Sequence, residues 1–168
     1  MENFEKFYNR ALRFLSFRPR SEKEIKDYFS KIKNQKSKIK IKDETIDAIV
    51  NKLKEHRFLN DEEFARLWIE SRLRYKPRSI SLIKRELLFK GVDKDIIDAQ
   101  ISNFQSASWR TISNELEMAK KLIEKKVQRY KNLPRQEIYQ KLGRFLAGKG
   151  FNWDTIKKSI DEVLEEKV

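Results

Sequence analysis

The sequence lacks cysteine and has a single histidine, His56, among its 168 residues. The absence of cysteine excludes a disulfide framework, a thiolate nucleophile and thiolate-bound zinc. One histidine cannot form a multi-histidine metal site, and we expect His56 at the end of a helix rather than in a catalytic triad. Neither common type of glycine-rich phosphate loop is present. The sequence therefore predicts a binding protein without a cofactor or a metal, and not an enzyme.

Glycine and proline are also scarce, with four and three residues. A chain with so few turn-forming residues should be mostly uninterrupted helix. No segment approaches the ~20 consecutive apolar residues that span a bilayer. The start of the sequence carries acids and lacks the basic residues and apolar run of a signal peptide. We therefore expect an all-α, cytoplasmic protein that does not enter membranes.

Acidic residues are outnumbered, because 39 lysines and arginines face 26 aspartates and glutamates, for a net charge of +13. Such an excess attracts polyanions, and nucleic acid is the expected partner. The alternative is a lysine-rich surface that only keeps the protein soluble. The three acids at residues 61–63 could in principle bind a metal, but they are better interpreted as the first turn of a helix.

An internal repeat organises the chain. Residues 18–21 (Arg-Pro-Arg-Ser) recur 58 positions later as residues 76–79 (Lys-Pro-Arg-Ser), and residues 90–92 (Lys-Gly-Val) recur 59 positions later as 149–151 (Lys-Gly-Phe). Each copy holds three amphipathic stretches with helical spacing. We expect three tandem three-helix repeats, at residues 1–58, 59–106 and 107–168, in an elongated, curved row. A single compact domain is the alternative.

Two segments depart from the repeat. Residues 31–42 form a basic spacer, and residues 106–113, which include Trp109, link the second and third repeats. Elsewhere, residues that favour helix starts and ends lie where the repeat predicts them. Ser21 with Glu24, and Asn60 with Glu63, fit capping boxes, and Gly91 and Gly150 should end helices. The other candidate N-cap residues are Asp43, Ser79, Asp93 and Asn152.

Several aromatic residues have a predicted packing role. Phe64, Trp68 and Tyr75 lie at or near core spacing, whereas Trp109 and Tyr130 fall outside it and could stack on a base or on a partner. The middle helix of the second repeat has Leu82 and Phe89 on a separate face. We expect those two residues to pack against a neighbouring repeat.

Basic residues recur at equivalent positions, and these carry the binding hypothesis. They flank the prolines that precede the middle helices, and Lys121, Lys125 and Arg129 form a stripe opposite an apolar helix face. For any single residue, a solvated helix face is the alternative. The candidate residues for binding DNA or a filament are Arg18, Arg20, Lys76, Arg78, Lys84, Arg85, Lys121, Lys125, Arg129, Arg135, Lys141, Arg144 and Lys149.

Three blocks of sequence resemble the RecX family. The middle block is the most specific: residues 58–65 (Phe-Leu-Asn-Asp-Glu-Glu-Phe-Ala), 77–79 and 86–92 agree in order, spacing and residue type. Residues 11–25 resemble the first repeat of that family, and residues 141–151 are similar to its third. The resemblance covers roughly residues 5–165. Departures are Pro77, where members often have glycine, and a shifted start of the third repeat at residues 133–136.

The resemblance implies a fold and a function. Family members are three tandem three-helix repeats that form a curved molecule, lie in the groove of the RecA–DNA filament and damp strand exchange, ATP hydrolysis and LexA co-cleavage. Some members bind single- or double-stranded DNA. We therefore expect a monomeric regulator whose partners are the RecA filament and DNA.

Two alternatives stay open. One is a stand-alone helix-turn-helix-like DNA- or RNA-binding protein that does not depend on RecA, and the other is a helical adaptor. The third helices of the first two repeats, at residues 43–55 and 93–106, carry acids and few arginines, which argues against the reading of base sequence.

Overall fold

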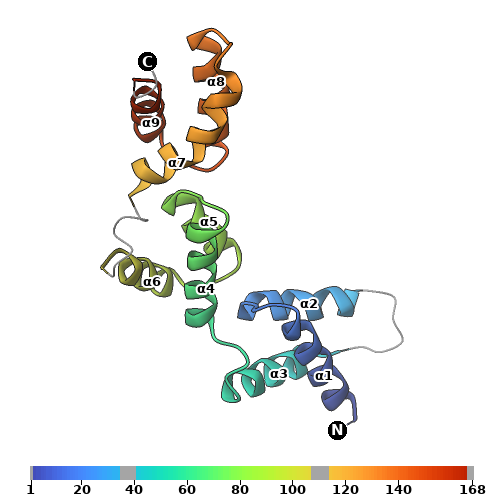
Figure 1. Cartoon of the computed structure of the whole chain (residues 1–168). Helices are drawn as coiled ribbons and strands as arrows, with labels where there is room; N and C mark the ends of the chain where they lie inside the picture. The colour runs from blue at the N-terminus through green and yellow to red at the C-terminus, as the bar shows by residue number, and fades with distance from the viewer. Residues whose placement is uncertain (1, 35–40, 107–113, 166–168) are drawn as a thin grey trace. The chain divides into compact units, whose positions relative to one another are not determined.

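The structure is a computed structural model, and it describes residues 2–34, 41–106 and 114–165. Within these ranges every regular element is helical, so the all-α prediction is confirmed (Figure 1). The α-helices are α1 (Glu2–Ser16), α2 (Glu22–Asn34), α3 (Asp43–Glu55), α4 (Asp61–Arg74), α5 (Ile80–Phe89), α6 (Lys94–Ser106), α7 (Glu115–Val127), α8 (Arg135–Ala147) and α9 (Trp153–Glu165), and a 3-10 turn, η2 (Gln128–Tyr130), follows α7. No helix in the described ranges is long and apolar enough to cross a bilayer.

The chain forms two compact units, Met1–Leu67 with Leu87–Asp98 and Trp68–Glu86 with Ala99–Val168. The division passes through α4, α5 and α6, so the second group of three helices contributes to both units. The predicted repeat boundaries at residues 58 and 106 therefore stay predictions. Residues 107–113 of the predicted linker, which include Trp109, lie outside the described residues, as do residues 35–40, half of the basic spacer. Residues 31–34 of that spacer form the end of α2.

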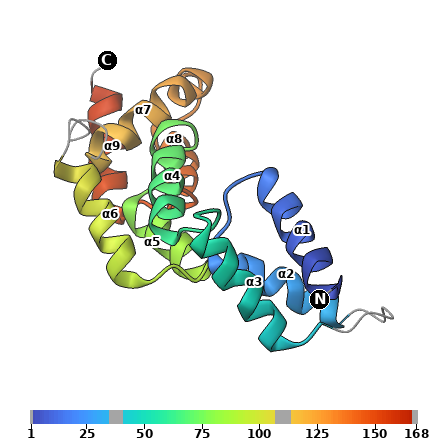
Figure 2. The same cartoon turned by 90° about the horizontal axis from the view of Figure 1, so that it is seen from below.

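The core of the first unit lies among α1, α2 and α3, which are grouped together in Figure 2. Phe7 from α1 meets Phe29 from α2 edge to face, with ring centroids 6.0 Å apart. Ile49 and Leu53 close this core from α3 and are fully buried. These residues lie on the apolar faces that the helical spacing predicts. Burial of each such side chain contributes about 1.5–3 kcal/mol of hydrophobic free energy.

The second unit has a comparable bundle formed by α7, α8 and α9, in which α7 packs against both other helices. Ile123, Leu142, Leu146 and Ile160 are fully buried at its centre. Asn114 caps α7, because its side chain accepts a hydrogen bond from the backbone N–H of Leu116 at 3.1 Å.

Five of the six predicted N-caps are confirmed. Backbone N–H groups of the first helical turns donate to the side-chain oxygens of Ser21, Asn60, Ser79, Asp93 and Asn152. The prediction for Asp43 is wrong, since α3 starts at Asp43 and its N-cap is Lys42, without a side-chain bond. The Asp43 carboxylate instead pairs with Lys33 at 2.8 Å. A carboxylate in the first turn is still stabilised by the helix dipole.

Gly91 and Gly150 end α5 and α8 in the left-handed region, with φ of 79° and 86°, as predicted. Space also requires glycine at both positions. A Cβ at Gly91 would lie 2.5 Å from Cβ of Lys23, and one at Gly150 would lie 2.5 Å from Cβ of Leu82. The predicted second face of α5 is thus half right, because Leu82 packs at Gly150 whereas Phe89 is 81% exposed.

Candidate functional site

A serine at the start of α2 joins the first repeat to the second within the first unit. The Ser21 hydroxyl donates to the carbonyl of Lys90 at 2.6 Å, and the backbone N–H of Glu22 donates to the carboxylate of Asp61 at 2.9 Å. Burial raises the pKa of Asp61, against the hydrogen bond from Glu22. One backbone N–H of the first turn of α2, that of Glu22, is therefore satisfied by an acid from the next repeat.

The second unit repeats this joint, but the acceptor of the serine hydroxyl lies one position further along the chain. The Ser79 hydroxyl donates to the carbonyl of Gly150 at 2.6 Å, and its backbone N–H donates to the carbonyl of Lys149 at 3.0 Å. The N–H of Ile80 donates to the carboxylate of Glu115 at 2.7 Å, as the N–H of Glu22 does to Asp61. Each joint thus combines a serine hydroxyl, a backbone carbonyl just after a helix and a carboxylate at the start of the next repeat.

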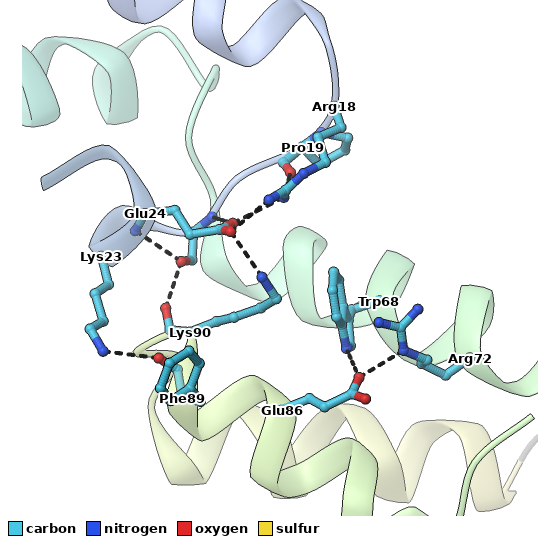
Figure 3. A network of polar contacts seen from close by, with 10 residues as sticks. Arg18, Pro19, Lys23, Glu24, Trp68, Arg72, Glu86, Phe89 and Lys90 are labelled. Carbon is cyan, nitrogen blue, oxygen red and sulfur yellow. Dashed lines mark hydrogen bonds and ion pairs between the residues drawn. The ribbon is translucent and has the colours of Figure 1, made fainter. Parts of the chain in front are cut away.

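A carboxylate network surrounds the first joint (Figure 3). Glu24 accepts hydrogen bonds from Arg18 at 2.7 Å and from Lys90 at 2.8 Å, and Lys23 donates to the carbonyl of Phe89 at 2.9 Å. Burial alone would raise the pKa of Glu24, but the bonds from Arg18 and Lys90 outweigh it and lower the pKa to about 2. Glu24 therefore pairs with two cations, Arg18 and Lys90, for which the sequence predicted no acidic partner.

In the second unit a different position supplies the acid, because Glu86 lies 58 residues after Tyr28 and not after Glu24. The Glu86 carboxylate accepts from Arg72 at 2.7 Å, from the indole N–H of Trp68 at 2.8 Å and from Arg78 (Figure 3 draws the first two). The Glu86 and Arg72 side chains are only 15% and 14% exposed. The Arg72 guanidinium also lies 4.1 Å above the Trp68 ring. This cluster is a structural support rather than an open site.

Three predicted binding residues thus have intramolecular roles. Arg18 pairs with Glu24, Arg78 pairs with Glu86, and the Arg20 guanidinium lies 3.9 Å above the Phe14 ring. Burial lowers the pKa of Arg20. The Nε atoms of Arg20 and Arg78 are buried without a hydrogen-bond partner among the described residues. Contact between these arginines and phosphates stays a prediction, but they first fix the loops that carry them.

The predicted stripe of the third repeat is the clearest open cationic surface. Lys121, Lys125 and Arg129 are exposed on α7 and η2, opposite buried Ile123 and Val127. In the described part of the chain, none of the three cations forms an ion pair with an acid. Their full charge is therefore available to an anionic partner.

The other predicted cations are distributed over the second unit. Lys76 and Arg85 are exposed, and Lys84 is half-buried and already interacts with another part of the chain. Arg135, Lys141 and Arg144 are exposed on α8, and the Lys149 ammonium lies 5.6 Å from the Phe145 ring centroid. Lys141 similarly lies 5.9 Å from the half-buried ring of Tyr130.

The packing predictions for the aromatic residues are confirmed for two of the three. Phe64 is 3% exposed and Trp68 is half-buried against Glu86, so their packing role is confirmed. The prediction for Tyr75 is wrong, because its ring is 76% exposed just beyond the end of α4. Three exposed aromatic residues were missed, namely Phe17, Phe58 and Trp153. Phe17 occupies the position equivalent to Tyr75, and Trp153 begins α9 with 64% of its surface exposed.

The described residues contain no group of three histidine, cysteine or acidic side chains that could hold a metal ion. The exposed cations and rings form the candidate site, a set of surfaces on a helical scaffold. Such surfaces can bind a polyanion by charge and by stacking.

Comparison with known proteins identifies this scaffold. Family models for the first, second and third three-helix domains of RecX match residues 8–31, 60–99 and 113–160. Curated relatives named regulatory protein RecX include one from Bacillus velezensis, 32% identical over 96% of this chain, and one from Bacillus subtilis, 30% identical over 96%. The chain spans 56% of the length of each of these relatives.

Solved structures agree. A crystal structure of RecX from Lactobacillus salivarius matches with a TM-score of 0.72 at 26% identity, covering 96% of this chain and 97% of that one. A second crystal structure of a regulatory protein RecX matches with a TM-score of 0.73 at 25% identity, covering 94% and 73%. The predicted fold of three three-helix domains is thereby confirmed, and the chain belongs to the RecX family of regulatory proteins.

Proposed function

We propose that this chain binds the RecA–DNA filament and lowers its ATP hydrolysis and strand exchange, without enzymatic activity of its own. The observation that carries the proposal is the match of three successive three-helix domains to the three domains of RecX, in the same order. The net charge of +13 supports a partner that presents phosphates or acids.

The stripe of Lys121, Lys125 and Arg129 is the proposed filament contact. It projects unpaired charge from a helix whose other face is fixed in a bundle, so binding needs little reordering of the backbone. A bound chain that contacts successive RecA subunits would restrict the rearrangements that accompany ATP turnover.

A sequence-reading DNA-binding protein is the less favoured function. Such a protein needs a recognition helix with exposed base-reading side chains, of which arginine is the commonest. The third helices of the three groups, α3, α6 and α9, contain no arginine. Binding of DNA by this chain should therefore depend on charge and on strandedness rather than on base sequence.

The direct test is the ATPase rate of RecA on single-stranded DNA with increasing amounts of the chain. We expect the rate to fall and to reach a plateau at saturation. An unchanged rate at saturating protein, together with no co-sedimentation with RecA filaments, contradicts the proposal. The same assay with DNA binding measured in the absence of RecA separates regulation from DNA binding alone.

Charge reversal locates the contact. Lys121→Glu, Lys125→Glu and Arg129→Glu together should weaken co-sedimentation with the filament by about 100-fold, since three exposed ion pairs contribute up to ~1 kcal/mol each. The matched control reverses Lys6, Arg10 and Arg13, three exposed cations on α1 that carry the same total charge. We expect less than about 5-fold loss for that control. Equal losses would mean that net charge alone drives binding, and not the stripe.

A further inference from the structure

Two loops at equivalent positions of the first and second repeats each expose an aromatic ring. Phe17 directly follows α1 and Tyr75 directly follows α4, and both precede a cation and a proline. The rings are 75% and 76% exposed. The surrounding positions have diverged between the two repeats, yet both copies keep a large ring in solvent. A ring that contributes so little to packing is expected to have a binding role.

We propose that these two loops are stacking platforms for single-stranded nucleic acid, in which each ring packs on an unpaired base while neighbouring cations contact the backbone phosphates. This inference rests on the proposed function, because it names the part of the chain that contacts nucleic acid. It assigns a role to two rings for which neither the core nor the cationic stripe of α7 accounts.

The loop of the first repeat borders a groove that fits this ligand. The groove has a volume of about 680 Å³ and lies within the first unit. The exposed Phe17 and Phe58 line it together with Arg18 and Arg57. Its one acid, Glu63, is paired with Arg66. A groove of this size accommodates a nucleotide. The combination of flat apolar faces with arginines matches a ligand that carries flat bases on an anionic backbone.

Both loops are held rigid from behind. Pro19 and Pro77 restrict the backbone, and the arginine after each proline is fixed, Arg20 on the Phe14 ring and Arg78 on Glu86. The rings are therefore presented at a low entropic cost of binding. The cation before each proline differs in the two loops. Arg18 pairs with Glu24, whereas Lys76 is exposed and has no ion-pair partner among the described residues.

Charge and shape favour a single strand over a duplex or a protein. In a duplex the faces of the bases are covered by their neighbours, so an aromatic ring on a loop has nothing to stack on. A protein partner that covers the rings would have to be acidic to match the flanking arginines and lysine. The repetition of ring, cation and proline in two copies fits a polymer whose own units repeat.

The test is binding of a fluorescent oligo(dT) by fluorescence anisotropy, without RecA, for the full chain and for a Phe17→Ser, Tyr75→Ser double variant. Each ring should account for at least about a 5-fold change in affinity, and the double variant should bind at least about 25-fold more weakly. Binding to a duplex of the same length should change by less than about 2-fold.

Phe89→Ser is the matched control, because Phe89 is 81% exposed and also lies near a lysine. Unlike Phe17 and Tyr75, it is not followed by a cation and a proline. Oligo(dT) binding by this variant should equal that of the unchanged chain. Thermal unfolding by circular dichroism verifies that all variants are folded.

Three outcomes would overturn the inference. The double variant could bind oligo(dT) as well as the unchanged chain, it could lose single-strand and duplex binding equally, or it could keep oligo(dT) binding and lose co-sedimentation with RecA. The last outcome would assign the rings to a protein contact. Inhibition of RecA by the unchanged chain is measured independently, so this inference can fail while the proposed function stands.

Discussion

The first and second repeats support the same loop with different side chains. In the first repeat, the Phe14 and Tyr28 rings stack with centroids 4.2 Å apart, and Arg20 lies over Phe14. The positions 58 residues later hold Arg72, Glu86 and Arg78, and there both arginines bind the one glutamate. The shared member is the arginine that follows the proline, and the other two positions change together.

The arginine behind the loop is held by a different kind of partner in each repeat. A guanidinium is stabilised by the face of an aromatic ring or by a carboxylate, so two stacked rings and an arginine–glutamate pair can serve the same purpose. The requirement is therefore a fixed arginine behind the loop, rather than one particular chemistry. The exposed rings of Phe17 and Tyr75 depend on that support in both repeats.

The largest expected effect comes from removing the ionic support. Glu86→Ala leaves Arg72 and Arg78 without their shared acceptor in a largely buried setting, and should lower the free energy of unfolding by about 3 kcal/mol. Urea unfolding at pH 7 measures this change. Glu63→Ala is the control, because Glu63 pairs with Arg66 at the surface and should cost less than about 1 kcal/mol. Equal losses of stability in Glu86→Ala and Glu63→Ala would mean that Glu86 does not support the loop.

A second variant exchanges the two supports. Arg72→Phe with Glu86→Tyr places the residues of the first repeat in the second, behind an unchanged Arg78. If the supports are interchangeable, the double variant should regain more than half of the stability lost in Glu86→Ala. A double variant that is no more stable than Glu86→Ala would show that each repeat depends on its own surroundings.

The pH dependence of stability probes the carboxylate network of the first repeat. The pKa of Glu24 in the folded protein is about 2, below its ordinary value of 4.5, so the Arg18 and Lys90 contacts add stability above pH ~4.5. That contribution is lost as the pH falls from ~4.5 toward ~2. With allowance for screening by solvent, Glu24→Gln should cost about 2 kcal/mol at pH 7. The difference between variant and unchanged chain should shrink steadily between pH 4.5 and 3.

The control for this titration is Glu5→Gln, since Glu5 makes a surface pair with Lys52 at 3.4 Å. Its variant should show a constant small difference across the same pH range. A Glu24→Gln variant whose deficit stays constant on acidification would mean that the lost contacts are not charge-dependent.

Local signals in the sequence predicted much of this scaffold. Ser21, Ser79 and the two left-handed glycines were predicted because caps and chain reversals have strong local preferences. The helical faces were predicted from spacing alone, and they supply the buried residues of each bundle. The 58-residue repeat then related the two serine joints before any geometry was available.

Contacts between elements could not be predicted in the same way. Tyr75 has core spacing if α4 is extended, but α4 ends at Arg74 and the ring is directed into solvent. Arg18 was predicted as a residue that binds DNA or a filament, yet the chain turns at Pro19 and brings it to Glu24, six positions along. Periodicity gives the face of a helix, and it gives neither the end of that helix nor the partner that a turn brings close.

The smallest predicted effect has the opposite sign and concerns the end of α3. Arg57 is the only non-glycine residue with positive φ among the described residues, at 57°, whereas α5 and α8 end with glycines in that region. Its N–H donates to the carbonyl of Lys54 at 2.9 Å, which is the bond a glycine would make there. Arg57→Gly should therefore stabilise the fold by about 0.5–1 kcal/mol in urea unfolding.

The same variant should weaken oligo(dT) binding several-fold, because Arg57 is one of the residues that line the groove, as is Phe17. Arg57→Ala separates the two effects. It removes the charge but keeps a side chain in the left-handed region, so it should lose binding equally and gain no stability. If Arg57→Gly gained stability and still bound oligo(dT) fully, the arginine would be a strained helix end without a role in the groove, and the stacking platform of the first repeat would depend on its rings and Arg18 alone.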